Sequence, residues 1–297
     1  MEIRQLQTFV YVVQLKSFSK VAEKLFLTQP TITSHIQSLE KELGVVLLNR
    51  SSKEITLTKG GQILYEYALN ILDLKDKALF SLDTYKERIK GSLTLAASSI
   101  PEQYVLPELM LEFRKSYPDV IFDIKHYSSR EAIDKIEKYD IEFGMVGTKI
   151  EHSKLSFVDL MEDQLVVIAP NHWKSIESPI TMEKLVTLPI ILREEGSGTR
   201  IQFENTLQQS GYSLEDLNIV CYLQSSEAIK EAVKKGLGIS IISEKAIKTE
   251  KHFNLLQVIP LKDLKITRNF YFIYHKNRAL SPLSDTFKKF VLDYLQK

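Results

Sequence analysis

The spacing of apolar residues changes part-way along the chain. The first helical pattern covers about 3–16, and its apolar face comprises Leu6, Phe9, Val10 and Val13. Beyond about residue 91, short apolar runs alternate with helical patterns instead. The sequence therefore predicts a helical N-terminal part followed by a larger α/β part.

Capping residues divide the N-terminal part into three short helices. Ser19 is placed to cap a helix over 20–26, and Thr28 is placed to cap a third helix. Pro30 falls in the first turn of that helix, where its missing N–H leaves no bond unmade. Gly44 is expected to end the helix in the left-handed conformation.

The third helix has two different faces. Its apolar face, expected to pack on the first two helices, comprises Ile32, Ile36, Leu39 and Leu43. The opposite face carries small, hydroxyl or amide side chains, which fit deep in a major groove and can bond base edges. We predict DNA contacts at and around this face, from Ser19, Thr28, Gln29, Pro30, Thr31, Thr33, Ser34 and Gln37.

The segment after the third helix predicts two short strands around the turn 51–53, with Arg50 and Lys53 at the tip. A basic tip of this kind can contact phosphates or the minor groove. Residues 1–61 contain eight basic and five acidic residues, a balance that suits contact with phosphate. The segment thus predicts a winged helix-turn-helix, the alternative being a three-helix module for protein contacts.

This N-terminal segment resembles the signature of LysR-type transcriptional regulators. The matching positions are Ala22, Leu25, Gln29, Pro30, Ser34, Ile36, Leu39, Glu40, Leu43, Gly44, Leu47, Arg50, Thr58 and Gly61. The chain departs from the family pattern where Phe is frequent, near Leu47 and Leu48, and where Ser is frequent, at Thr31 and Thr33. The resemblance implies a sequence-specific regulator that binds double-stranded DNA at operators or promoters, with RNA polymerase as a partner.

A long helix is predicted from Lys59 to about Ile89, capped by Thr58. Its apolar stripe comprises Ile63, Leu64, Ala68, Ile71, Leu72, Leu74, Ala78, Leu79, Leu82 and Tyr85. The stripe is too wide for an isolated exposed helix, so we expect it to pack against its twin in a second subunit. The alternative is a core helix within one domain. The LysR resemblance implies a homodimer through this helix, or a dimer of dimers (a homotetramer).

The remaining chain predicts a mainly parallel sheet covered by helices. Strands are expected at 92–97, 120–124, 141–147, 165–170, 189–192, 219–223, 238–242 and 270–274. Helices are expected near 101–116, 129–138, 198–210, 226–235 and 282–296. About 200 residues is long for one small sheet, so two lobes joined by crossing strands are favoured.

The resemblance implies a periplasmic-binding-protein-like fold for these lobes. The expected segments are 1–58 for the winged helix-turn-helix, 59–90 for the linker and dimerisation helix, and 91–297 for the effector-binding domain. Within the last, lobe I is expected at about 92–162 and 267–297, and lobe II at about 163–266.

Hydroxyl groups gather where strands end and helices begin, which is where open α/β sheets bind ligands. We expect Ser99 to cap the helix at 101 while Ser98 faces the cleft, and we place Glu194 and Glu195 outward. Free N–H groups at helix starts favour an anion. The candidate effector residues are Ser98, Ser99, Thr148, Arg193, Ser197, Gly198, Thr199 and Ser225. The alternative for each serine or threonine is an ordinary helix cap, and Arg200 could join the site or face solvent.

REEGSGTR and EAIKEAVKKGLGISIIS resemble a LysR branch tied to sulphur or selenium metabolism. That resemblance implies an oxyanion or a small sulphur-related metabolite as effector.

Composition and motifs narrow the remaining function classes. The 297 residues carry a net charge of +1, and no apolar run reaches the length of a membrane span. A single cysteine and no signal-peptide pattern predict a cytoplasmic protein without a membrane partner. The six histidines lack metal-ligand spacing, and no phosphate loop, dinucleotide fingerprint or nucleophile elbow is present. We therefore expect no enzyme, cofactor or metal; the rivals are a solute receptor without DNA function and an enzyme.

Overall fold

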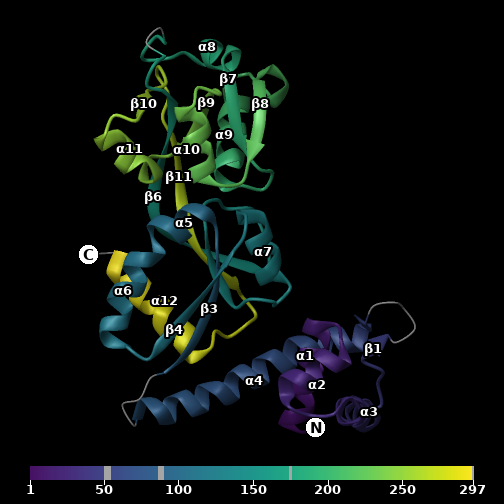
Figure 1. Cartoon of the computed structure of the whole chain (residues 1–297). Coiled ribbons are helices and arrows are strands. Elements are labelled where there is room, and N and C mark those ends of the chain that lie inside the picture. Colours follow the sequence, from purple (N-terminus) through teal and green to yellow (C-terminus); the bar gives the residue numbers. More distant parts are fainter. Residues whose placement is uncertain (50–54, 86–89, 174–175, 296–297) are drawn as a thin grey trace. The chain divides into compact units, whose positions relative to one another are not determined.

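The computed structural model describes residues 1–49, 55–85, 90–173 and 176–295. The chain divides into two units, Met1–Ile89 with Lys276–Asp285, and Lys90–His275 with Thr286–Lys297. Each unit is described here by itself (Figure 1). The expected fold class is confirmed: a helix-turn-helix domain, a long helix and a two-lobed α/β domain follow one another along the chain.

The N-terminal unit is helical, with one short antiparallel ribbon. Its elements are α1 (Ile3–Leu15), α2 (Phe18–Leu25), α3 (Gln29–Leu43), β1 (Leu48–Asn49), β2 (Thr56–Leu57) and α4 (Lys59–Tyr85). Apolar side chains of α1, α2 and α3 form a common core in which Leu6, Phe9, Val21, Ile32, Ile36 and Leu39 are buried. The predicted core position Leu43 is wrong: it is exposed, because it is the last residue of α3 and Gly44 turns the chain directly after it (φ +67°).

The cap of the second helix also differs from the prediction. Ser17, and not Ser19, caps α2, its side chain accepting a hydrogen bond from the Lys20 amide. The helix begins two residues earlier than expected because Phe18 and Ser19 already belong to its first turn. The Thr28 cap is confirmed, since its hydroxyl accepts from the Thr31 amide.

The start of α4 is fixed by two residues of the recognised signature. The Gly61 amide donates to Thr58 Oγ1 at 2.9 Å, which confirms the predicted cap, and Thr58 Oγ1 donates to the Val46 carbonyl. A Cβ on Gly61 would lie 2.0 Å from the Leu47 carbonyl oxygen. Only glycine therefore lets the first turn of α4 pass this close to the segment that leads into β1.

The C-terminal unit is built on one mixed sheet with the strand order β4-β3-β5-β11-β6-β9-β7-β8, and β10 pairs with β6. The strands are β3 (Gly91–Ala97), β4 (Val120–His126), β5 (Phe143–Val146), β6 (Leu155–Pro170), β7 (Pro189–Arg193), β8 (Asn218–Leu223), β9 (Ile239–Ser243), β10 (Leu256–Ile259) and β11 (Ile266–His275). The helices are α5 (Ser99–Tyr104), α6 (Leu106–Ser116), α7 (Ser129–Glu137), α8 (Met182–Thr187), α9 (Gly198–Gln209), η1 (Leu214–Asp216), α10 (Ser226–Lys234), η2 (Glu244–Ile247), α11 (Lys248–His252) and α12 (Pro282–Leu295).

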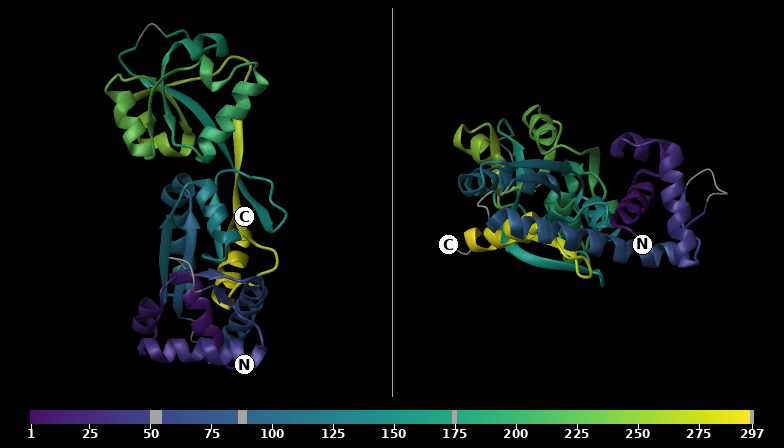
Figure 2. Two further views of the ribbon diagram at one scale, coloured as in Figure 1. Left: turned by 90° about the vertical axis from the view of Figure 1, so that its right-hand side faces the viewer. Right: turned by 90° about the horizontal axis from the view of Figure 1, so that it is seen from below.

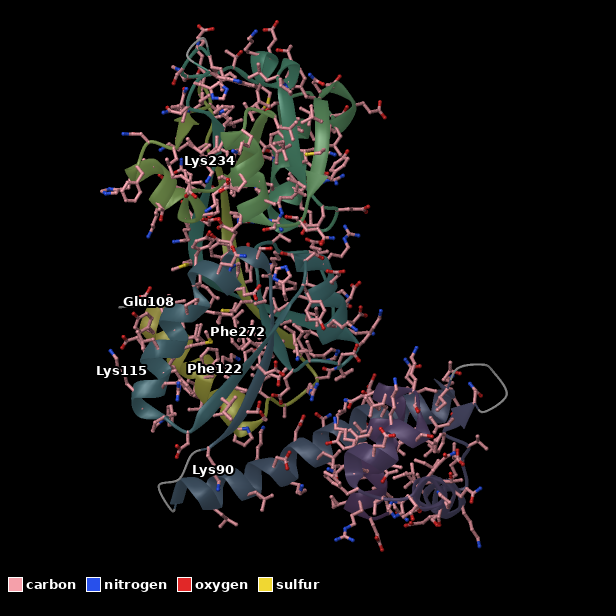
Figure 3. The ribbon with its side chains drawn as sticks, in the orientation of Figure 1. Lys90, Glu108, Lys115, Phe122, Lys234 and Phe272 are labelled. Carbon is pink, nitrogen blue, oxygen red and sulfur yellow. The ribbon has the colours of Figure 1, made fainter. Side chains whose placement is uncertain are left out.

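Two long antiparallel strands, β6 and β11, connect two lobes (Figures 1 and 2). We use lobe I for the part with β3, β4, β5, α5, α6, α7 and α12, and lobe II for the part with β7–β10 and α8–α11. The register of β6 and β11 shifts between Phe270 and Tyr271, where the pair passes from one lobe to the other. Each lobe has its own core, and Phe272 lies inside that of lobe I while Glu108 and Lys115 lie at its outer edge (Figure 3).

Several predicted elements are longer, shorter or divided. The helix expected over 101–116 is two helices, because Pro107 has no N–H to donate and the chain turns at Val105. β6 begins at Leu155, ten residues before the predicted start. Its first part carries Asp159, Glu162 and Asp163, which interrupt the apolar run, so the pattern predicted only the second part of the strand. β10, α8 and α11 were not predicted.

Candidate functional sites

The face of α3 that carries small and amide side chains is accessible. Thr28, Gln29, Pro30, Ser34 and Gln37 are exposed, and Thr31 and Thr33 are half-buried. This is the surface on which the sequence placed base and phosphate contacts. A helix can enter the major groove only with a face of this kind directed outward.

Hydrogen bonds already use part of that face. Ser19 Oγ donates to Gln29 Oε1 at 3.0 Å, which links α2 to the start of α3. Thr33 Oγ1 donates to the Gln29 carbonyl at 3.1 Å, so this hydroxyl is committed to the helix backbone. Thr28 and Thr31 share a hydrogen bond of 2.8 Å between their hydroxyls.

Ser34 and Gln37 differ from these residues. Neither side chain bonds another residue within the described part of the chain, and both are exposed. The Gln37 amide therefore keeps its donors and its acceptor available for a base edge.

The predicted wing is present as the β1–β2 ribbon, in which Leu48 pairs with Leu57 and Asn49 with Thr56. Asn49 Nδ2 donates to Thr56 Oγ1 and to the Leu57 carbonyl. The two basic residues predicted at the tip, Arg50 and Lys53, lie outside the described residues.

A second candidate site lies between lobes I and II, where several helix starts meet. The cavity is lined by Ser98, Ser99, Ile100, Pro101, Ser128, Ser129, Arg193, Glu194, Ser197, Gly198, Thr199 and Arg268. The starts of α5 and α7 come from lobe I, and the start of α9 comes from lobe II. The structure thus brings together five of the predicted effector residues with Arg193.

At the cavity, a glycine allows the start of α9 in lobe II to lie directly against lobe I. A Cβ on Gly198, the first residue of α9, would lie 2.9 Å from the carbonyl of Gly147 and 3.0 Å from Ser129 Oγ. The start of α9 therefore touches the backbone that follows β5. Ser129 Oγ in turn accepts from the Gly147 amide at 3.3 Å.

Two serines at helix starts do not act as caps. Ser98 stands at the cap position of α5 and Ser197 at that of α9, yet neither side chain makes a cap hydrogen bond. Both residues are buried, and neither hydroxyl has another partner among the described residues. The expectation that Ser99 caps this helix is wrong: Ser99 is its first residue, and its hydroxyl instead accepts from Arg193.

Arg193, at the end of β7, makes side-chain hydrogen bonds to residues of both lobes around the cavity. Its Nη2 donates to Ser99 Oγ across the lobes at 2.9 Å, and its Nη1 donates to Ser226 Oγ at 3.3 Å. Glu194 accepts from Arg193 through both carboxylate oxygens. The expected outward orientation of Glu194 is therefore wrong, because this carboxylate gains a bidentate ion pair by turning to the guanidinium.

Arg268, on β11, is the second guanidinium of the cavity. Its Nε donates to Asp163 Oδ2 at 2.9 Å and its Nη1 to Thr199 Oγ1 at 3.1 Å. Its Nη2 is buried and has no hydrogen-bond partner in the part of the chain that the structure describes. Burial lowers the pKa of Arg268, although Asp163 opposes this shift. A buried donor without a hydrogen-bond partner is unfavourable, so an acceptor atom of a ligand bonded to this nitrogen would stabilise the site.

Two other predicted residues lie apart from this cavity. Thr148 lines an adjoining polar cavity of about 390 Å³ that also includes Arg268, Gln202, Asn205 and Asn269. Ser225 does not line either cavity: it is exposed and caps α10 by accepting from the Ala228 amide, and the buried Ser226 takes its place beside Arg193. The N-terminus of α10 thus supplies an ordinary cap at Ser225.

Arg200 also turns away from the cavity. Its Nε donates to Glu204 Oε1 at 2.6 Å, and its guanidinium lies over the Tyr222 ring.

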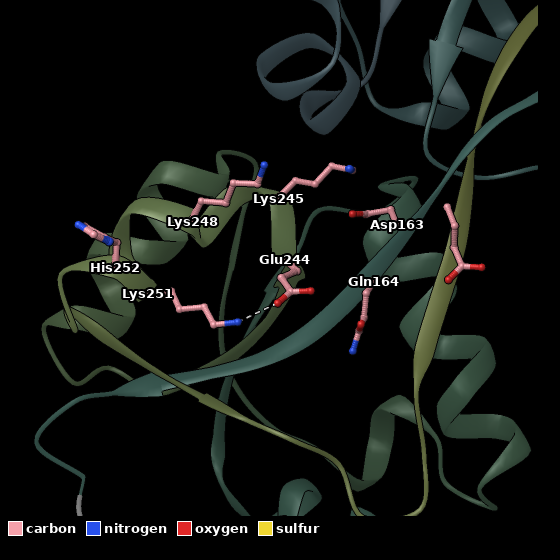
Figure 4. A pocket seen from close by; sticks show the side chains of 8 residues that line it. Asp163, Gln164, Glu244, Lys245, Lys248, Lys251 and His252 are labelled. Atoms are coloured by element: carbon pink, nitrogen blue, oxygen red, sulfur yellow. Dashed lines mark hydrogen bonds and ion pairs between the residues drawn. The ribbon is translucent and has the colours of Figure 1, made fainter. Parts of the chain in front are cut away.

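A larger cavity lies elsewhere, on the side of η2 and α11. It measures about 550 Å³ and is lined by Glu162, Asp163, Gln164, Glu244, Lys245, Lys248, Lys251 and His252 (Figure 4). Two of these lining residues are paired: Lys251 Nζ donates to Glu244 Oε1 at 3.0 Å (dashed line in Figure 4). None of the predicted effector residues lines it.

A further polar network joins lobe I and lobe II. Tyr104 of α5 donates through its hydroxyl to Glu227 of α10, and burial together with this bond raises the pKa of Tyr104 to about 12. Lys230, which is buried, bonds Glu227, Glu250 and the Ala246 carbonyl. Lobe I and lobe II are therefore held by Tyr104–Glu227 as well as by Ser99–Arg193.

Sequence reasoning missed several residues that line the cavity between the lobes, among them Ser128, Ser129 and Arg268. Ser128 and Ser129 follow β4 and open α7, in a capping box with Glu131, so the same strand-end argument that selected Ser98 would have selected them. Arg268 gave no signal, because it precedes the apolar run from which β11 was predicted.

The described residues offer neither a metal-binding cluster nor a membrane-spanning helix. Among them, no group of three or more His, Cys, Asp or Glu side chains could bind a metal ion. None of the described helices has the length and apolarity that crossing a membrane requires.

Comparison with known proteins assigns both parts of the chain. Residues 3–62 match the family model "Bacterial regulatory helix-turn-helix protein, lysR family", and residues 86–296 match "LysR substrate binding domain". An uncharacterised HTH-type transcriptional regulator of Methanocaldococcus jannaschii is 33% identical, with 98% of each chain covered. The HTH-type transcriptional regulator CysL of Bacillus subtilis is 30% identical over 95% of this chain and 92% of its own. Because the identities to these two relatives are so close, the comparison does not place the chain in the sulphur or selenium branch of the family.

Solved structures show the same fold. A full-length OxyR variant from Pseudomonas aeruginosa has a TM-score of 0.76 at 20% identity, covering all of this chain and 95% of its own. CbnR in complex with its target DNA has a TM-score of 0.60 at 22% identity, covering 98% and 99%. The regulatory domain of CcmR from Synechocystis PCC6803, in complex with 2-PG, has a TM-score of 0.63 at 26% identity and covers 70% of this chain and 99% of its own.

The accessible face of α3 and the polar cavity between the lobes thus occur in a chain whose two parts both match LysR models. This family consists of regulators and not of enzymes. The chain belongs to the LysR family: it is a DNA-binding transcriptional regulator with an effector-binding domain.

Proposed function

We propose that this regulator reads its operator through α3 and responds to a small anion bound between lobes I and II. The observation that carries the proposal is Arg268, a lining residue of the cavity whose buried Nη2 lacks a partner among the described residues. Ser98 and Ser197, whose hydroxyls make no cap hydrogen bond, line the same cavity. An oxyanion supplies acceptors for all three groups.

The ends of helices strengthen the preference for an anion. α7 and α9 direct the positive ends of their dipoles toward the cavity, and Ser129, Gly198 and Thr199 belong to their first turns. The solved complex of CcmR with 2-PG, a relative at 26% identity, supports a small ligand in this domain. Chemistry at the cavity favours a carboxylate, sulfate or phosphate group.

Hydrogen bonds between the two lobes are the contacts through which effector binding would change the arrangement of the lobes. Ser99–Arg193 and Tyr104–Glu227 both cross the gap between lobe I and lobe II. An effector acts as a switch only if it binds one arrangement of the lobes more tightly than another. A ligand that contacts Ser98 of lobe I and Ser197 of lobe II meets this condition.

On the DNA side, we infer that Ser34 and Gln37 read base edges, while Ser19, Thr28, Gln29, Pro30, Thr31, Thr33, Arg50 and Lys53 position the domain on the duplex. The structure of CbnR with its target DNA supports this mode of docking in the same fold. We further propose that the regulator is a homodimer or a dimer of dimers that acts in the cytoplasm and communicates with RNA polymerase. The predicted segments 1–58, 59–90 and 91–297 remain our proposed functional division.

Replacing Gln37 with alanine tests base readout. We expect affinity for the promoter of its own gene to fall about 10- to 100-fold, since a good bidentate contact to a base is worth about 1–3 kcal/mol. Affinity for unrelated DNA should change little. The measurement is a gel-shift titration at physiological salt with both DNA sequences. Gln62→Ala, which removes an exposed amide from the first turn of α4, is the matched control. An equal loss on all DNA would exclude base readout by Gln37.

The double substitution Ser98→Ala with Ser197→Ala tests the effector cavity. We expect affinity for inorganic sulfate, phosphate or 2-PG, whichever the wild type binds, to fall about 10-fold or more, because two hydroxyl donors to a charged group are lost. DNA binding without these anions should be unchanged. Calorimetric titration gives the affinities.

Ser225→Ala is the control for this experiment. It removes the exposed cap of α10, so we expect a loss of about 1 kcal/mol in stability and no loss of anion affinity. Should the double variant bind as tightly as the wild type, the two hydroxyls are not ligands. Failure of the wild type to bind any of a wide panel of small anions would refute the anion proposal itself.

A further inference from the structure

Glu194 makes an unusual contact for a residue that lines an anion site. Its Oε2 accepts from Arg193 Nε at 2.8 Å and its Oε1 accepts from Arg193 Nη2 at 2.9 Å. This two-pronged geometry is the one with which arginine binds the carboxylate or phosphate of a ligand. The carboxylate of Glu194 therefore already provides Arg193 with what an effector would bring.

Little space is left beside it. The cavity has a free volume of about 10 Å³, which is room for about one water molecule. A ligand with a carboxylate or larger head group can enter only if a lining group moves. The question is which of the lining groups can do so.

The charged groups of the cavity differ in how firmly they are held. Arg193 bonds Ser99, Ser226 and Glu194, and its side chain is 5% exposed. Arg268 bonds Asp163 and Thr199 and is equally enclosed. The Glu194 carboxylate bonds Arg193 alone among the described residues, and its side chain is 20% exposed. Glu194 is thus the charged group that can turn out to water at the smallest loss of contacts.

We infer that Glu194 is an internal stand-in for the anionic group of the effector, which must displace it from Arg193. The inference rests on the proposed function and deepens it. Displacement requires an incoming group with two oxygen atoms on one centre, because only such a group replaces both hydrogen bonds of the fork. Carboxylates, sulfates and phosphates qualify, whereas an alcohol does not.

The stand-in also sets the sensitivity of the response. Every effector molecule must replace the Arg193–Glu194 ion pair, so the apparent affinity is lower than the intrinsic affinity of the cavity. Removing the charge of Glu194 should therefore tighten anion binding. A residue that merely lines or supports the site would give the opposite result when it is substituted.

The test compares Glu194→Gln with Glu195→Gln in the full-length protein. Glu195 is the exposed neighbour, so both variants lose one negative charge at nearly the same place. The dissociation constant for inorganic sulfate is measured by calorimetric titration, with ionic strength held constant by sodium chloride. We expect Glu194→Gln to bind sulfate about 10-fold more tightly than the wild type, since a charge-assisted competitor becomes a neutral one. Glu195→Gln should bind as the wild type does.

Other outcomes separate this inference from the proposed function. Equal sulfate affinity in the wild type and in Glu194→Gln, or the same gain in both variants, overturns the stand-in and leaves the anion site in place. Weaker binding by Glu194→Gln overturns it as well and makes Glu194 a supporting residue. Absence of binding in all three proteins overturns the stand-in together with sulfate as a model of the effector. Glu194→Ala, which leaves no carboxamide to bond Arg193, repeats the comparison if the glutamine variant does not fold.

Discussion

Replacing Arg268 with alanine is expected to lower the free energy of unfolding of the α/β unit by about 3–5 kcal/mol. Asp163 is fully buried, and its Oδ2 accepts from Arg268 Nε at 2.9 Å. Among the described residues, the Ser243 hydroxyl, which donates to Oδ1 at 2.6 Å, would then be the one remaining side-chain partner of this carboxylate. A buried charge without its counter-charge is among the most unfavourable changes that a single substitution can produce.

The Asp163–Arg268 ion pair also lies on the two strands that connect the lobes. Asp163 is on β6 and Arg268 is on β11, and the two residues are register partners in the strands that pass between the lobes. Urea unfolding followed by the fluorescence of Trp173 measures the effect. This single tryptophan is partly buried against the core of lobe II, so its signal comes from the affected unit.

The double substitution Arg268→Met with Asp163→Leu is the control. It removes both charges at once, and we expect a smaller loss than that caused by Arg268→Ala alone, because no charge is left buried. A loss below about 1 kcal/mol for Arg268→Ala would mean that water reaches Asp163.

Replacing Leu74 with glutamate is expected to weaken subunit association through α4 by at least about 100-fold. Ile63, Tyr67 and Leu74 recur on one face of α4 and are 56%, 64% and 67% exposed. The buried residues Tyr65, Ala68 and Leu69 lie on other sides of the helix, and α4 packs on α1. Ile63 and Leu74 belong to the stripe that the sequence predicts to pack against a second subunit, whereas Ala68 of that stripe is buried and Tyr67 was not part of it.

The size of the effect follows from symmetry. In a two-fold dimer each substitution occurs twice, so two carboxylates would lose water with no cation to pair with them. A 100-fold change corresponds to about 2.7 kcal/mol. Sedimentation velocity over a range of protein concentrations gives the dimer dissociation constant. DNA affinity should fall in parallel, since two half-sites are then no longer bound together.

Phe253→Glu provides the matched control. Phe253 is 65% exposed in the C-terminal unit, so the substitution adds the same charge at a similarly exposed apolar position away from α4. A dimer that survives Leu74→Glu unchanged would show that α4 does not form the subunit contact.

Local signals in the sequence were sufficient for the N-terminal domain. The spacing of Ile32, Ile36 and Leu39, the Thr28 cap and the Gly44 end all appear in the structure as predicted. They could be predicted because each depends on residues within about one or two turns of the same helix. The prediction failed at Ser19, since Ser17 competes for the same cap and the sequence alone does not rank two candidates that lie two residues apart.

The cavity between the lobes was predictable only in part. Ser98, Ser197, Gly198 and Thr199 were found because strand ends followed by helix starts have a recognisable local pattern. The same pattern selected Ser225, which the structure turns outward as an ordinary cap. Both kinds of serine look alike in sequence, because burial depends on the opposite lobe and not on the neighbouring residues.

The sequence by itself determined the family, the order of the domains, the recognition helix and most of the hydroxyl groups around the cavity. These features are encoded within short segments, where side-chain periodicity and capping act directly on the backbone. Only the tertiary structure decided that Arg268 enters the cavity, that Asp163 neutralises it and that Glu194 turns inward to Arg193. Arg268 and Asp163 are 105 residues apart, and their pairing arises from the register of β6 against β11. Backbone hydrogen bonds across the whole sheet set this register, so no local pattern in the chain could have disclosed it.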